Sequence, residues 1–148
     1  MNRLAFLVLN GLTGLMWVGC GQTPTDSLGT TTVNTPKPAN RVAMYYMHRT
    51  FRCFSCLWIE NTTREALKES FPSELASGRL EFQVEDYWKR EDLSKRYDVQ
   101  AVSIVVVNIA DGREFSHQTL EKVWDLKGKP EFRAYVVDAV RAALAKTK

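Results

Sequence analysis

The 148-residue chain lacks most of the short motifs that mark a catalytic or nucleotide-binding site. It contains no glycine-rich phosphate loop, no Gly-x-Ser-x-Gly nucleophile turn and no His-Glu-x-x-His zinc motif. With only 2 histidines, a multi-histidine metal centre is excluded. The net charge is a mild +3, and charges of both signs alternate without a recurring basic block. We therefore expect no nucleic-acid partner.

Cysteine is also scarce, but two of the 3 cysteines stand together in Cys53-Phe54-Ser55-Cys56. The pair lies where an apolar, strand-like run gives way to a helix-like run. A thiol at a helix N-terminus faces unpaired backbone N–H groups and the positive end of the helix dipole, which favours the thiolate. A second thiol one turn later can close on it as a disulfide. In a strand–helix context this spacing indicates redox chemistry, whereas a bridge closing so few residues is a poor structural staple.

The long apolar run of the chain is confined to its N-terminus. Met1-Asn2-Arg3 is short and positive, residues 4–18 are mostly apolar, and the run ends in Trp17-Val18-Gly19-Cys20. Because this run is short and a polar tract follows, residues 1–19 are predicted to be an export signal, not a membrane span.

This segment resembles a bacterial lipoprotein signal, which implies cleavage before Cys20 and lipid attachment to its thiol. Trp17 departs from the aliphatic residue common at that position. The alternatives are an ordinary secretory signal cut nearby and an uncleaved anchor. Each of them sends the protein out of the cytoplasm, and we expect a membrane-anchored lipoprotein of the cell envelope facing the periplasm or exterior. Disulfides persist in such compartments.

Residues 20–40 form a separate segment by composition. The stretch from Gln22 to Asn40 holds six threonines and three prolines, with few sizeable apolar side chains. Such a composition cannot bury enough surface to offset its ordering entropy. We predict a disordered tether between the membrane and a folded domain, or alternatively a disordered tail without that role. Residues 41–148 have the composition of one globular domain.

Hydrophobic periodicity predicts alternating strands and helices in that domain: strands at 41–47, 80–84, 104–107 and 113–118, and helices at 53–71, 91–97 and from 130 onward. The β-branched run at 104–107 is apolar on both faces, which favours a central strand. Asp111-Gly112 predicts a hairpin turn into an exposed antiparallel strand. This order predicts an α/β fold, a mixed sheet with helices on both faces.

The two long helices are predicted to bury one face each, and Pro130 suits the first turn of the last helix. Candidate buried positions in the first helix are Leu57, Ile59, Ala66, Leu67 and Phe71. Those in the last helix are Phe132, Tyr135, Val136, Ala139, Val140, Ala143 and Leu144. Trp58, Trp88 and Trp124 could line a groove, although packing in the interior is the more frequent role of tryptophan.

With this element order, residues 41–148 resemble the thioredoxin superfamily. The landmarks are the dithiol at the start of the first long helix and residues 97–107, which look like the stretch leading into the family's third core strand. The resemblance implies a central mixed four-stranded sheet and thiol–disulfide exchange. It also implies a thiol or disulfide protein partner, and no cofactor besides the redox-active disulfide.

A narrower resemblance rests on Arg49-Thr50-Phe51-Arg52-Cys53-x-x-Cys56 and Val123-Trp124. These residues are similar to a small exported thioredoxin-like group named for a nitroaryl-compound reductase subunit. Reduction of a nitroaryl compound needs a flavin or a nicotinamide, and the chain shows no binding signature for either. The resemblance therefore implies that this chain passes electrons and does not itself reduce the substrate.

Three departures from the superfamily pattern stand out. Arg52 replaces the usual aromatic residue before the first cysteine, and Phe54-Ser55 replaces dipeptides such as Gly-Pro. Ser103 aligns with the cis-proline that faces the dithiol and shields it from metal. This serine argues against broad disulfide-reductase activity and makes metal binding by the thiolates more credible. The first strand also lacks the buried carboxylate that often assists proton transfer.

The resemblance assigns Cys53 as the attacking thiolate and Cys56 as the resolving thiol. Arg52, with His48 and Arg49 as further candidates, would stabilise the thiolate through its charge. Three alternatives stay open: an inert cysteine pair, a non-catalytic binding module, and a metal-handling protein. In the last case Cys53, Cys56 and His48 would bind copper or zinc, since copper(I) accepts two or three soft ligands.

Overall fold

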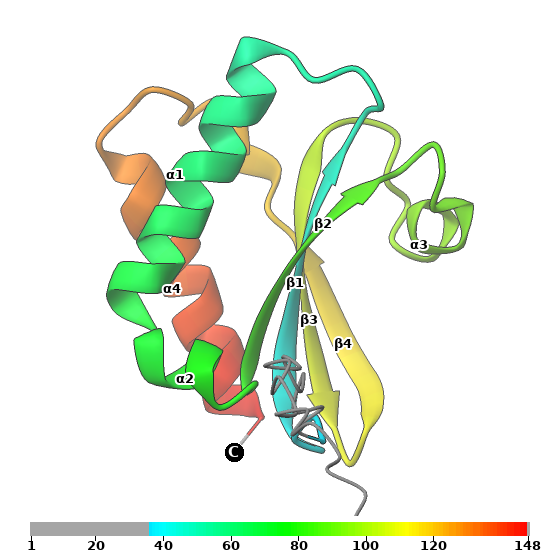
Figure 1. Ribbon diagram of the computed structural model, residues 1–148, viewed down its shortest axis with the longest axis vertical. Coiled ribbons are helices and arrows are strands. Elements are labelled where there is room, and N and C mark those ends of the chain that lie inside the picture. Colours follow the sequence, from blue (N-terminus) through cyan, green and yellow to red (C-terminus); the bar gives the residue numbers. More distant parts are fainter. Residues whose placement is uncertain (1–35, 148) are drawn as a thin grey trace, which may run out of the picture. The chain divides into compact units, whose positions relative to one another are not determined.

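The computed structural model describes residues 36–147, so the predicted signal, Cys20 and most of the predicted tether lie outside the described residues. Figure 1 shows a sheet at the centre of the described region, with helices packed beside it. Within residues 36–147 no helix combines the length and the apolar character that a membrane crossing requires.

The sheet contains four strands in the order β2-β1-β3-β4: β1 (Arg41–His48), β2 (Leu80–Asp86), β3 (Ser103–Ala110) and β4 (Arg113–Thr119). Strand β2 runs parallel to β1, while β1–β3 and β3–β4 are antiparallel. The β-branched run of β3 is buried in an inner strand, and β4 is an exposed edge, as the sequence predicts. Both residues of the β3–β4 turn, Asp111 (φ 51°) and Gly112 (φ 74°), have positive φ, the conformation that a tight hairpin of this kind requires.

The helices are α1 (Phe54–Ser70), α2 (Pro72–Ala76), α3 (Glu91–Arg96) and α4 (Glu131–Lys146), with a 3₁₀ turn η1 (Glu121–Val123) before α4. Figure 1 shows α1 and α4 against one side of the sheet and the short α3 on the other side. A βαβ unit, an antiparallel hairpin and a closing helix in this order make a thioredoxin-like fold, which confirms the predicted fold class.

Burial on α1 differs from the prediction at three positions. Leu57 is 42% exposed although it was expected in the core, whereas Glu60 and Thr63 are buried. The buried stripe of α1 runs through Cys56, Ile59, Glu60 and Thr63, at helical spacing. Leu57 follows Cys56 by one residue and is therefore rotated about 100° away from that stripe. In α4, Tyr135 and Ala139 are only partly buried, and the other predicted positions lie in the core.

Residues 37–40 contact the domain at the end of the sheet where β1 begins. Lys37 forms a 2.8 Å ion pair with Glu81 of β2. The carbonyl of Ala39 accepts a 2.9 Å hydrogen bond from the Gly112 N–H, and Asn40 Oδ1 accepts one of 3.0 Å from the Asp111 N–H. These contacts attach the segment that leads into β1 to strand β2 and to the β3–β4 hairpin.

Candidate redox site

Cys53 and Cys56 form a disulfide at the N-terminus of α1, with their Cα atoms 5.0 Å apart. Cys53 is exposed and is the N-cap of the helix, in an extended backbone conformation. Its Sγ accepts a 3.1 Å hydrogen bond from the Cys56 N–H, and Cys56 itself is buried at 4% exposure. The first turn of α1 carries no acidic side chain. A sulfur held at this position benefits from the positive end of the helix dipole when it carries a negative charge.

The disulfide opens onto a pocket of about 430 Å³. Its lining residues come from the loop before α1, the first turn of α1, and the segments after β2, before β3 and after η1: Arg49, Phe51, Cys53, Cys56, Trp88, Ala101, Val102 and Trp124. Trp124 Nε1 donates a 2.9 Å hydrogen bond to the Val102 carbonyl, which ties two walls of the pocket together. Trp88 and Trp124 thus line the pocket. Trp58 instead packs edge-on against Phe132, with the two ring centroids 5.0 Å apart.

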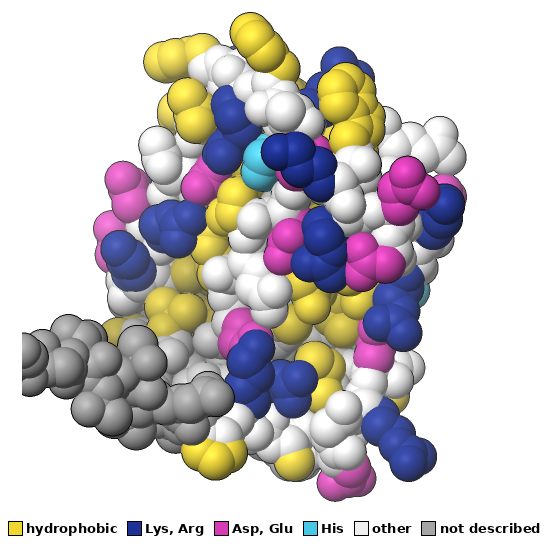
Figure 2. Space-filling model, turned by 45° about the vertical axis from the view of Figure 1, so that its right-hand side comes forward, with side chains coloured by type: hydrophobic (Ala, Val, Ile, Leu, Met, Phe, Trp, Pro, Cys, Tyr) yellow, Lys and Arg dark blue, Asp and Glu magenta, His cyan; other side chains and the backbone are white. Residues whose placement is uncertain are grey.

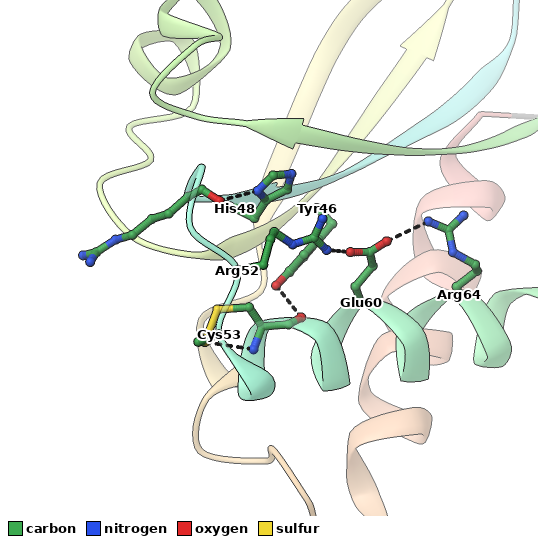
Figure 3. Close-up of polar contacts among 8 residues, drawn as sticks. Tyr46, His48, Arg52, Cys53, Glu60 and Arg64 are labelled. Carbon is green, nitrogen blue, oxygen red and sulfur yellow. Dashed lines mark hydrogen bonds and ion pairs between the residues drawn. A yellow bond between two sulfur atoms is a disulfide. The ribbon is translucent and has the colours of Figure 1, made fainter.

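Arg52 belongs to an ionic cluster beside the disulfide. It forms an ion pair with Glu60, which also accepts a 2.9 Å ion pair from Arg64 one turn later in α1. Figure 3 shows Arg52 and Arg64 on either side of Glu60, with Cys53 at the start of the same helix. The Arg52 guanidinium also lies 6.0 Å from the ring centroid of Tyr46. The charge of Arg52 is therefore largely balanced inside the domain, and its role toward the Cys53 thiolate stays a prediction.

Tyr46, on β1, connects the sheet to the second cysteine. Its hydroxyl donates a 2.7 Å hydrogen bond to the Cys56 carbonyl, and its side chain is fully buried. Burial raises the pKa of Tyr46 to about 12, with the nearby Arg52 opposing that rise. The hydroxyl consequently stays a neutral donor across the physiological range and holds the first turn of α1 against the sheet.

The loop between β1 and α1 is fastened to the residues that follow β2. The Tyr87 N–H donates to the His48 carbonyl at 2.9 Å, and Arg49 Nε donates to the Tyr87 hydroxyl at 2.8 Å. The Arg49 guanidinium lies 5.8 Å from the Trp88 ring centroid. Thr50 donates to the Asp86 carboxylate, and this hydrogen bond holds the pKa of Asp86 below its usual range.

The remaining predicted site residues lie nearby but not among those that line the pocket. Ser103 is the first residue of β3, pairs with Met47, and donates a 3.0 Å hydrogen bond to the Ala101 carbonyl. His48 Nδ1 lies 2.6 Å from the Arg49 carbonyl oxygen. Among residues 36–147 no group of three or more His, Cys, Asp or Glu side chains is placed to hold a metal, so His48 does not join the two cysteines in such a cluster.

Several residues of the site, among them Tyr46, Glu60 and Lys127, were not anticipated from the sequence. Glu60 lies four residues after Cys56 on the buried stripe of α1, and its position between Arg52 and Arg64 in the sequence is the signal that could have found it. Lys127 comes from the turn after η1 and donates a 3.0 Å hydrogen bond to Ser55 Oγ, between the cysteines. Nothing in the local sequence connects Lys127 to the dithiol, since the contact depends on the tertiary fold.

No family profile matches the chain, and no curated protein sequence matches it. Among solved structures it is similar to chloroplastic thioredoxin z, with 18% identity, a TM-score of 0.47, and coverage of 71% of this chain and 80% of that one. It is similar to a thioredoxin from Fasciola hepatica, with 20% identity, a TM-score of 0.42, and coverage of 73% and 82%. A thioredoxin from Halobacterium salinarum gives 16% identity, a TM-score of 0.44, and coverage of 74% and 77%.

Proposed function

We propose that the protein performs thiol–disulfide exchange with a protein partner through Cys53 and Cys56. One observation carries the proposal: an exposed sulfur at the N-cap of α1 accepts a backbone hydrogen bond and is bonded to a buried second sulfur. This geometry gives one sulfur that a partner can reach and one that is protected. The position also stabilises the thiolate that exchange requires.

The exchange has two steps, written here for the reduced protein. The Cys53 thiolate attacks one sulfur of a partner disulfide, a new S–S bond forms, and the other partner sulfur leaves as a thiolate that takes up a proton. The Cys56 thiol then loses its proton and attacks the Cys53 sulfur, which releases the second partner thiol. The partner gains two electrons and the protein becomes the Cys53–Cys56 disulfide. In the opposite direction the same steps oxidise a partner dithiol.

The hydrogen bond from Tyr46 to the Cys56 carbonyl supports the division of roles between the two sulfurs. It holds the backbone of the buried cysteine on the sheet, so that Cys56 stays within reach of Cys53 when the disulfide is open. Thiol–disulfide exchange needs a populated thiolate and a reachable partner sulfur, and no bound cofactor.

The cellular setting of the proposal comes from the N-terminal sequence. The signal-like residues 1–19 and the following Cys20 support an exported protein held at the membrane of the cell envelope by a lipid on Cys20. A contribution to nitroaryl-compound reduction would consist of passing electrons to a cofactor-bearing partner. Replacing Cys20 with alanine should abolish incorporation of a labelled fatty acid and release the protein from the membrane fraction, and continued labelling of Cys20→Ala would contradict lipid attachment at this site.

The test of the exchange function is a redox titration of the full chain in graded thiol buffers, followed by alkylation mass shift. A reversible two-electron transition between about −270 and −120 mV is expected, the range spanned by known thiol–disulfide oxidoreductases. The metal content of the same sample is measured. The proposal would be overturned by the absence of a transition, or by thiols that are isolated bound to copper or zinc and do not turn over. In the second case, Ser103→Pro should weaken metal binding.

A further inference from the structure

We propose that the surface around the disulfide selects partner segments in which the reacting cysteine lies next to an apolar side chain and an acidic one. The proposal rests on the exchange function above and names its substrate class. It is carried by the coincidence, at one end of the domain, of an exposed aromatic surface and two cations that have no carboxylate partner among residues 36–147.

Exposed apolar side chains lie on the residues next to the disulfide and in its pocket. Phe51 is 87% exposed, Phe54 is 84% exposed and Trp88 is 60% exposed, while Leu57 and Trp124 are exposed to a smaller degree. Figure 2 shows hydrophobic side chains gathered at the upper end of the molecule, where α1 begins. Soluble proteins seldom expose several large apolar side chains side by side unless the surface binds something. Phe51, Trp88 and Trp124 line the pocket of about 430 Å³ at the disulfide, a volume in the range of binding pockets. Phe54 and Leu57 line a second pocket, along α1.

Two positively charged side chains lie at this surface. Arg49 is the charged residue among those that line the pocket, and Lys127 contacts the segment between the two cysteines. Neither forms an ion pair with a carboxylate of the described residues, whereas Arg52 is balanced by Glu60. Asp86, the last residue of β2, already accepts hydrogen bonds from Thr50 and from the Trp88 backbone and forms an ion pair with Lys89. An acidic side chain of a partner therefore finds two available cations and no competing acid in the pocket lining.

These features favour a protein segment as the occupant. A cationic, aromatic rim around an attacking sulfur is complementary to a cysteine whose neighbours are an apolar residue and an aspartate or glutamate. Basic neighbours would place like charges beside Arg49 and Lys127. Selection of this kind acts mainly on the encounter rate and depends on ionic strength, because the cations are exposed.

The test uses the full chain carrying Cys20→Ser, so that Cys53 and Cys56 are its remaining thiols. The reduced protein is mixed with disulfide-linked dimers of short peptides of three kinds. One has aspartates and a phenylalanine beside its cysteine, the second has lysines in place of the aspartates, and the third has serine in place of the phenylalanine. The rate at which the protein reduces each peptide disulfide is divided by the rate at which dithiothreitol reduces the same disulfide. This ratio corrects for differences in the intrinsic reactivity of the peptides. The first peptide should exceed the second by about tenfold at low salt, and the ratio should shrink in 1 M salt.

Variants separate the two parts of the surface. The double change of Arg49→Gln and Lys127→Gln should bring the ratio of the acidic to the basic peptide close to one. Phe54→Ser with Trp88→Ser should lower the rates with both phenylalanine peptides relative to the rate with the serine peptide. The matched controls are Phe115→Ser, an exposed phenylalanine on β4, and Lys146→Gln, at the end of α4. Neither control should change any of the rates.

A photo-crosslinking phenylalanine analogue at position 54 identifies the occupant directly. Crosslinking to the acidic, phenylalanine-containing peptide supports the proposal. Crosslinking to a second copy of the chain or to its own residues 1–35, with the peptide present, overturns it. Equal, rapid exchange with all three peptides also overturns the selection while the exchange function stands. The absence of exchange with any of them overturns both.

Discussion

Arg52, directly before the exposed Cys53, is bound by an ion pair to Glu60, which lies one turn beyond the buried Cys56 on the same helix. Glu60 also binds Arg64, so one partly buried carboxylate serves two guanidinium groups. The cationic residue nearest to the reactive sulfur in the sequence is thus largely neutralised within the fold. In the proposed exchange, the electrostatic support of a Cys53 thiolate then falls mainly to the N-terminus of α1.

Replacing Glu60 with glutamine tests this arrangement. The change leaves Arg52 and Arg64 without their counter-ion in a partly buried site, and we expect a loss of about 1–3 kcal/mol in the free energy of unfolding. It also releases the charge of Arg52, so that alkylation of Cys53 should reach its half-maximal rate at a lower pH. Urea denaturation and the pH dependence of alkylation measure the two effects. Glu65→Gln, which removes an exposed carboxylate paired with Arg133, is the control and should cost under about 1 kcal/mol. Equal effects of both variants would show that Glu60 has no special role.

Tyr46→Phe removes the hydroxyl that donates to the Cys56 carbonyl. At pH 8 the variant should be less stable than the wild type by about 0.5–1.5 kcal/mol, because one buried hydrogen bond is lost. At high pH the wild type should lose this advantage in stability over Tyr46→Phe. Burial raises the pKa of Tyr46 from its ordinary value of 10.0 to about 12. The stability that the neutral Tyr46 side chain contributes is therefore complete below pH 10 and is lost as the pH rises toward 12.

The stability of the wild type should therefore fall more steeply than that of Tyr46→Phe between pH 10 and pH 12, the interval between the ordinary and the raised pKa. Urea titrations at pH 8, 10, 11 and 12 measure the difference. Tyr135→Phe, whose hydroxyl only accepts a long 3.4 Å hydrogen bond from the Lys122 N–H, is the control at pH 8. Parallel curves for the wild type and Tyr46→Phe across the alkaline range would contradict the assignment.

The two cysteines should differ in the species they trap. Cys56→Ser removes the resolving sulfur and should accumulate a mixed disulfide between Cys53 and the partner, visible as a shifted band on non-reducing gels of cell-envelope extracts. Of the pair, Cys53→Ser leaves only the buried sulfur of Cys56 and should trap nothing through it. If Cys53→Ser gave the stronger adduct, the roles of the two sulfurs would be reversed. If neither variant gave an adduct, a protein substrate would be ruled out under those conditions.

Gly112 offers a test of the hairpin that joins β3 and β4. Its φ is +74°, and apart from the two adjoining residues no atom of the described residues lies within 4 Å of the position that a Cβ would take. The strain of Gly112→Ala is therefore confined to the backbone and should cost about 1–2 kcal/mol of unfolding free energy. Gly112→Asn should cost less, because asparagine tolerates the left-handed region better than alanine. Equal losses in the two variants, measured by thermal or urea unfolding, would contradict this explanation.

Much of the fold follows from local sequence patterns. The β-branched run of β3 and the Asp111-Gly112 turn predict the central strand and the hairpin because their signals are confined to a few adjacent residues. The apolar spacing of α4 likewise predicts its buried face. The exposure of Leu57 was not predicted, because hydrophobicity alone does not show which side of an irregular helix meets the sheet.

The candidate site was predictable only where it is local. The cysteine pair and its position at a helix N-terminus follow from the sequence, since they depend on neighbouring residues. The contacts of Tyr46 with Cys56, of Lys127 with Ser55 and of Trp124 with Val102 join segments that are distant in the chain. They depend on the register of the sheet and the packing of α1, which no local pattern encodes.

The contacts of residues 37–40 fix the end of the domain at which the chain enters β1. Lys37, Ala39 and Asn40 attach to one pole of the sheet, and β1 then runs from Arg41 to His48 before the chain reaches the cysteines. Eight strand residues at about 3.3 Å each separate the two poles by about 25 Å. The point where the chain enters the domain and the disulfide therefore lie at opposite ends of β1.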